Sequence, residues 1–252
     1  EKQMRRRVLI LSIHHTGQQC FWILLVFLSL SGSIHSQKIE VGTWVGTAHY
    51  FGDINTQLAF HLPGPAAGVF MRNNIGTRFS FKHAFICGTI EGRDNLSTDP
   101  FFIQRNLSFK SQVFEISEIF EFNFLDFLNR NKKFWISPYI ATGVAVFFFN
   151  PKTEYKGQWY DLQPLGTEGQ NDPTYSGRKK YRLYNVAIPV AGGVKIAVSR
   201  HLSIGLDVQV RKTLTDYLDD VSSVYVSPVS LPDGDRGLSY ALMDRSGEVG
   251  DK

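Results

Sequence analysis

Cysteine is nearly absent from this chain, whose 252 residues include only Cys20 and Cys87. Cys20 lies in an N-terminal segment that we expect to be removed, and a lone Cys87 cannot form an internal disulfide. Nothing therefore predicts a disulfide-stapled secreted module. The sequence also lacks a Gly-rich phosphate loop, a Cys-x-x-Cys pair, a His-Glu-x-x-His motif and a Gly-x-Ser-x-Gly motif. We expect a protein that is not an enzyme and that uses no cofactor.

A large excess of charge of one sign is lacking too. The formal net charge is +4, but residues 1–36 carry four basic residues against one acidic residue, which leaves +1 for the rest. No basic face remains that would bind a phosphate backbone. We therefore expect no nucleic-acid partner.

The sequence contains only one long apolar run, at residues 21–30, and only Ser29 interrupts it. Three arginines precede it at residues 5–7, and small residues follow as far as Ser36. This order predicts a cleavable export signal over residues 1–36. The alternative is a membrane-anchoring helix, although the run has only about half of the ~20 apolar residues that a spanning helix needs. Since no other segment approaches that length, an exported chain could span a membrane only as a closed barrel.

The sequence has instead a regular alternation of apolar residues with small or polar ones. It holds over residues 184–199 and again over residues 202–211, and only a hairpin-length connection separates the two runs. A period of two is the signature of a strand. Less regular alternation predicts five earlier strands, at residues 39–48, 67–72, 78–86, 114–124 and 135–149.

The polar faces of these strands favour a membrane barrel over a soluble sandwich or a lipocalin-like barrel. They are rich in glycine and alanine with isolated charges, which suits the narrow interior of a small barrel. The connections alternate between short (74–77, 125–132, 199–201) and long (51–65, 92–105, 150–183), as in outer-membrane barrels. The sequence predicts an all-β fold over residues 37–252: a small antiparallel transmembrane β-barrel of about eight strands with long outer loops.

Only seven strands are visible, whereas single-chain bacterial barrels normally have an even number. After Arg211 the sequence continues without another alternating run. Either the chain is truncated before its last strand or a partner supplies that strand, and we prefer truncation.

Charged residues on the polar faces are the main candidates for a functional role. We expect them to pair across the lumen and to seal it; the alternative is an ion path. The inward set comprises Glu115, Glu121, Lys195, Asp207 and Arg211, joined by Arg72, Arg78 and Lys82.

An acidic stretch follows the last strand. Asp216, Asp219 and Asp220 could offer oxygen ligands to a cation. They lack the tight loop of alternating acceptors of a calcium site, so we expect no metal and favour a solvated acidic patch or a capped turn.

Several segments resemble the PorG-like outer-membrane barrels of the type IX secretion system. Residues 39–42 (Ile-Glu-Val-Gly) with 48–53 (Ala-His-Tyr-Phe-Gly-Asp) are similar to that family's first strand and loop. Residues 65–73 and 137–145 are similar to its second and middle strands. The most specific stretch is 213–222, which contains Asp216, Tyr217, Leu218, Asp219 and Asp220. The resemblance covers most of residues 38–226.

The resemblance implies a non-enzymatic component of the secretion machinery. Such a protein would contact outer-membrane lipid and would anchor the periplasmic ring, which consists of a lipoprotein and its partner. The short turns at 74–77, 129–133 and 200–201 are the geometric candidates for that contact. The alternative is a stand-alone small outer-membrane barrel that serves adhesion or binds small apolar solutes.

Overall fold

The computed structural model describes residues 39–56, 60–127, 135–170, 178–199, 201–222 and 236–249. They all belong to one compact unit, Ser36–Lys252, and the predicted export signal lies outside the described residues. Seven long strands dominate, so the prediction of an all-β fold is confirmed. They are β1 (Ile39–Ala48), β2 (Gly64–Ile75), β3 (Phe79–Arg93), β4 (Ser108–Asn123), β5 (Ile136–Tyr155), β7 (Tyr184–Ala197) and β8 (Ser203–Thr213).

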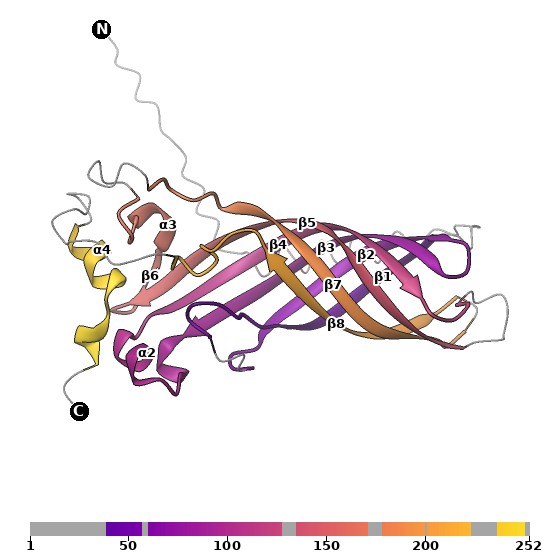
Figure 1. Cartoon of the computed structure of the whole chain (residues 1–252), viewed down its shortest axis with the longest axis horizontal. Helices are drawn as coiled ribbons and strands as arrows, with labels where there is room; N and C mark the ends of the chain where they lie inside the picture. Colours follow the sequence, from indigo (N-terminus) through magenta and orange to yellow (C-terminus); the bar gives the residue numbers. More distant parts are fainter. Residues whose placement is uncertain are drawn as a thin grey trace, which may run out of the picture. The chain divides into compact units, whose positions relative to one another are not determined.

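These strands form one antiparallel sheet in the order β1-β2-β3-β4-β5-β7-β8 (Figure 1). Every strand neighbours the next long strand along the chain, as hairpin connections dictate. Within the described ranges β1 and β8 each pair on one side only and not with each other. The sheet is therefore a half-barrel with two open edges.

The smaller elements gather at one end of the sheet, which we call the long-loop end (Figure 1). The opposite end, the short-turn end, carries the β2–β3 and β7–β8 connections. The elements at the long-loop end are a short strand, β6 (Gln158–Asp161), the helices α2 (Pro100–Arg105), α3 (Leu162–Leu165) and α4 (Arg236–Met243), and the 3₁₀ turns η1 (Asp94–Leu96) and η4 (Ser246–Glu248). None of the helices in the described part of the chain combines the length and the apolar character needed to cross a membrane.

The two faces of the sheet differ in character, because successive side chains of a strand point to opposite faces. In β5, Ser137, Tyr139 and Ala141 are buried, whereas the intervening Ile140 and the nearby Val144 are exposed. We call the buried face the inner face and the other the outer face. Small, polar and charged residues thus lie inside and aliphatic ones outside, the reverse of a water-soluble sheet.

The largest apolar core cluster lies at the long-loop end, and two smaller ones lie along the inner face of the sheet around Ile119 and Phe147. The buried members of the largest cluster come from the loops, the strand ends and the helices: Tyr50, Ile54, Ile90, Phe109, Leu162, Leu165 and Leu242. Burial of these side chains helps to hold α3 and α4 over this end. Further along the strands the inner face also carries buried charges.

Several strands extend beyond their predicted limits. The second strand was expected at residues 67–72 and spans Gly64–Ile75; the third was expected to end near residue 86 and continues to Arg93. The added part of β3 contains glycine and threonine and lacks alternation, but it pairs with β4 along its whole length. Pairing between strands therefore overrides the weak local pattern.

The short strand β6 was not predicted. It pairs with the end of β5 through a two-residue turn, Lys156–Gly157, in which both residues have positive φ angles of 51° and 78°. Positive φ at both central positions is the requirement of a tight hairpin turn, and glycine meets it without strain. The Lys-Gly pair, which lies between aromatic residues, was the sequence signal that could have predicted this turn.

Candidate functional site

Glu121 occupies the centre of a charged cluster on the inner face. Its side chain is fully buried, with 0% exposed, and it accepts hydrogen bonds from Arg72 Nε at 2.7 Å and Lys195 Nζ at 2.6 Å. Lys82 Nζ lies 3.1 Å from the other carboxylate oxygen, Oε1, and the Ser80 hydroxyl donates to Oε2 at 3.2 Å. Arg72 in turn reaches Glu40 of β1 at 2.6 Å. One carboxylate thus links side chains from β2, β3 and β7 to β4.

A second ion pair lies on the same face, nearer the long-loop end. Arg211 of β8 donates from Nε to Glu115 of β4 at 2.5 Å. Strands β5 and β7 lie between these two, so a flat sheet would separate their backbones by about three spacings of ~4.8 Å. The side chains meet because the sheet curls, which shows that the inner face is the concave one.

Two of the expected inward charges are not part of these buried ion pairs. Asp207 is on the inner side of β8 and accepts from Tyr139 at 2.7 Å, but it is exposed because β8 is an edge strand. Arg78 is outside the cluster: it pairs with Asp126 at 2.8 Å on the surface of the short-turn end. It precedes the first residue of β3, where alternation no longer decides the direction of a side chain.

The acidic stretch after β8 folds into the long-loop end. Asp219 accepts a short hydrogen bond from the Tyr50 hydroxyl, which lies in the β1–β2 connection. Asp220 accepts from Thr167 Oγ1 at 2.6 Å and from the Tyr181 hydroxyl at 2.5 Å, both in the β6–β7 connection. Both carboxyl groups are buried, so a solvated patch is the wrong alternative for them, whereas Asp219 caps a turn by accepting from Val221 N at 3.2 Å. Each is buried because loops distant in sequence cover it.

Burial changes the acidity of this group, which we call the aspartate clasp (Asp219, Asp220, Tyr50, Thr167 and Tyr181). Loss of hydration raises the pKa of Asp219 and of Asp220 to about 7, against the hydrogen bonds that lower it. Burial and the neighbouring Asp220 likewise raise the pKa of Tyr181. The clasp therefore keeps its hydroxyl donors protonated while its carboxyl groups titrate near neutrality.

The other residues of the stretch pack around the clasp. Tyr217 stacks on Tyr181 with ring centroids 4.8 Å apart and a tilt of 9°, and Leu218 is half-buried against the apolar core. Asp216 stays exposed and accepts from Ser222 at 3.0 Å. Among the described residues no three His, Cys, Asp or Glu side chains converge as a metal ion would require.

The partners Tyr50, Tyr139, Thr167 and Tyr181 were not anticipated from the sequence. Tyr50 and Asp219 are 169 residues apart, so no local pattern joins them. The one sequence signal was Tyr139, a bulky hydroxyl-bearing residue followed on its face by small residues at 141, 143 and 145. With hydrogen bonds and ion pairs directed inward, both clusters are suited to holding strands and loops together.

Comparison with known proteins assigns this chain a family. The model of one protein family, described as a domain of unknown function (DUF6089), matches residues 18–224. No curated protein and no solved structure matches the chain.

Proposed function

The chain belongs to the DUF6089 family, and we propose that it is a non-enzymatic outer-membrane β-barrel that anchors the periplasmic ring of a type IX protein secretion system. The supporting observation is the outer face of the sheet, where aliphatic side chains are exposed in rows. Val45 and Leu206 are each 81% exposed, and Val208 is 75% exposed. In water these rows would be an aggregation surface, whereas hydrocarbon solvates them favourably.

A barrel that spans a membrane must cover the open edges of β1 and β8. In a bilayer the unpaired backbone groups of β1 and β8 would find no water to bond with, at a cost of several kcal/mol each. We therefore propose that an eighth long strand closes the barrel between β1 and β8.

The anchoring role is supported by the resemblance to PorG-like barrels and by the filled inner face. Three cations surround Glu121 on the concave side, which suits a sealed scaffold better than a conduit for solute. The short-turn end carries compact connections, such as the one between Ile75 and Phe79. In an exported barrel, such turns would face the periplasm.

Membrane insertion is tested by cell fractionation and by gel mobility. Wild-type protein should fractionate with the outer membrane and should migrate faster unheated than boiled, because a folded barrel binds less detergent. A soluble protein in the periplasm would contradict the proposal.

Ring anchoring is tested by insertions at matched turns. An eight-residue hydrophilic insertion after Gly76, at the short-turn end, should abolish co-purification of the ring lipoprotein and its partner. The same insertion after Gly157, at the long-loop end, should leave co-purification intact. The two sites are matched, because both glycines have positive φ and a Cβ added at either one meets nothing within 4 Å. Recovery of the wild-type barrel without ring proteins would favour the stand-alone barrel instead.

A further inference from the structure

A polar cleft of about 300 Å³ opens at the long-loop end, separate from the clusters above. It is formed by the end of β3, the start of β4, the β5–β6 hairpin and the segment after α4. Five cationic residues line it against two acidic ones, Glu91 and Glu154. The cations are Arg93, Lys110, Lys152, Lys156 and Arg245.

Two of these cations lie directly opposite each other. Lys110 of β4 and Lys152 of β5 are cross-strand partners, an arrangement in which like charges repel. Nearby carboxylates neutralise the charges of these two lysines only in part. Lys110 lies 3.8 Å from Glu91, which already pairs with Arg93 at 2.6 Å. Lys152 pairs with Asp161 at 3.0 Å. Even when Asp161 and Glu248, the carboxylate partners of Lys152 and Arg245, are counted with the lining, five cations face four carboxylates, so the cleft attracts anions.

Arg245 is the most buried cation of the cleft. Its side chain is 12% exposed, and its Nη1 donates to Ser108 Oγ at 3.0 Å and to Thr153 Oγ1 at 3.2 Å. Glu248 holds the opposite side of the guanidinium at 2.8 Å. These contacts fix the guanidinium plane before any ligand arrives, which lowers the entropy cost of binding.

An exposed tryptophan completes the lining. Trp159 of β6 is 53% exposed and is the cross-strand partner of Glu154. A flat, half-exposed indole offers a large apolar surface next to polar groups. The apolar face of a sugar ring packs on such a surface, while its hydroxyls can bond to Glu154 and to the amides of Asn95 and Asn106, which also line the cleft.

We propose that this cleft binds an anionic saccharide, a sugar carrying phosphate or carboxylate groups. The lysines and arginines bind the acidic groups, Trp159 packs on a ring face, and the polar rim bonds to hydroxyls. A free phosphate ion would leave the tryptophan and the amides unused. In an outer-membrane barrel the long-loop end faces away from the cell, where such saccharides are displayed, but the binding itself does not depend on ring anchoring.

The experiment titrates the refolded full chain in detergent with three probes and follows heat of binding. The probes are a glucosamine disaccharide carrying two phosphates, the same disaccharide without phosphate, and inorganic phosphate. The phosphorylated disaccharide should bind saturably, at least tenfold more tightly than either of the other two. Its affinity should fall as salt is raised, because the attraction is ionic.

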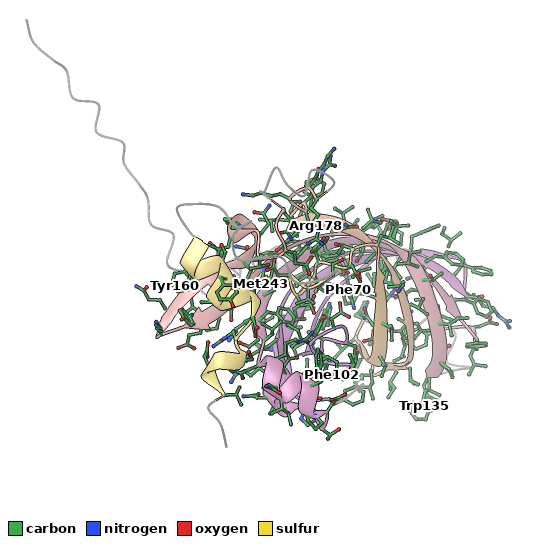
Figure 2. All side chains as sticks on the ribbon, turned by 60° about the vertical axis from the view of Figure 1, so that its left-hand side comes forward. Phe70, Phe102, Trp135, Tyr160, Arg178 and Met243 are labelled. Carbon is green, nitrogen blue, oxygen red and sulfur yellow. The ribbon has the colours of Figure 1, made fainter. Side chains whose placement is uncertain are left out.

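Matched variants separate the two kinds of contact. The double variant K110Q/K152Q and the single variant W159A should each weaken binding of the phosphorylated disaccharide about tenfold or more. K212Q, an exposed lysine on β8, and W135A should bind as the wild type does. Figure 2 shows Trp135 at the end of the sheet remote from Tyr160 of β6 and Met243 of α4.

Three results would overturn the proposal. Equal affinity for inorganic phosphate and the phosphorylated disaccharide would reduce the cleft to a simple anion site. Equal losses in K212Q or W135A would place the binding elsewhere. An absence of saturable binding to protein with wild-type circular dichroism would remove the site altogether, while leaving membrane insertion and ring anchoring untouched.

Discussion

At the scale of single residues, Glu121 has the largest predicted effect on the stability of the fold. Its carboxylate neutralises three buried cations, Arg72, Lys82 and Lys195. E121Q removes that charge without removing volume, and a buried cluster left uncompensated costs about 3–5 kcal/mol. We expect the unfolding midpoint in urea to fall sharply in detergent. E154Q, at an exposed position on β5, should unfold as the wild type does, and equal stability of the two variants would refute this role of Glu121.

The aspartate clasp predicts a dependence of stability on pH. Asp219 and Asp220 have pKa values raised to about 7, whereas in the unfolded chain aspartate titrates near 3.9. Between these limits the folded state holds more protons, so the contribution to stability is complete below pH ~4 and is lost as pH rises to 7. Each group can contribute up to ~1.4 kcal/mol per pH unit.

D220N tests this dependence. Asparagine keeps an acceptor for Tyr181 and tolerates the positive φ of 68° at this position. The variant should match the wild type at pH 3.5 and exceed its free energy of unfolding at pH 8, with D216N, at an exposed aspartate of the same stretch, as control. Lower stability of D220N than wild type at pH 8 would show that the carboxylate is needed in its charged form.

At the scale of elements, close approach of strands β4 and β5 depends on Gly143. A methyl group there would overlap the carbonyl oxygen of Glu118 on β4. G143A must therefore push the two strands apart, which costs roughly 1–3 kcal/mol. G192A on β7 is the matched control, because a methyl group there meets nothing within 4 Å. Similar unfolding midpoints for the two variants would mean that the β4–β5 spacing is not limiting.

At the scale of the whole molecule, the ion pairs across the concave face predict a sealed barrel. Glu121 bonds to residues of β2 and β7, and Glu115 to Arg211 of β8, so side chains from distant strands meet across the curl. We expect vesicles containing the protein to show neither ion conductance nor swelling in small sugars, with an open porin as positive control. Steady single-channel currents would contradict the sealed interior and would favour a transport role.

The sequence by itself determined the strands and their faces. Alternation along residues 135–149 correctly predicted that Ser137, Tyr139 and Ala141 share one face and Ile140 and Val144 the other. This is possible because the pleat is a local property of the backbone with a period of two residues. The tight Lys156–Gly157 turn was equally local, although it was overlooked.

The tertiary structure alone decided which charged groups meet. Whether Arg211 reaches Glu115, or Asp219 reaches Tyr50, depends on register, on the curl of the sheet and on the paths of loops. Each of these properties depends on many contacts between residues far apart in sequence, so no short segment determines it. For the same reason the sequence left a solvated patch and a capped turn both open for the aspartates after β8, whereas the β1–β2 and β6–β7 connections bury Asp219 and Asp220.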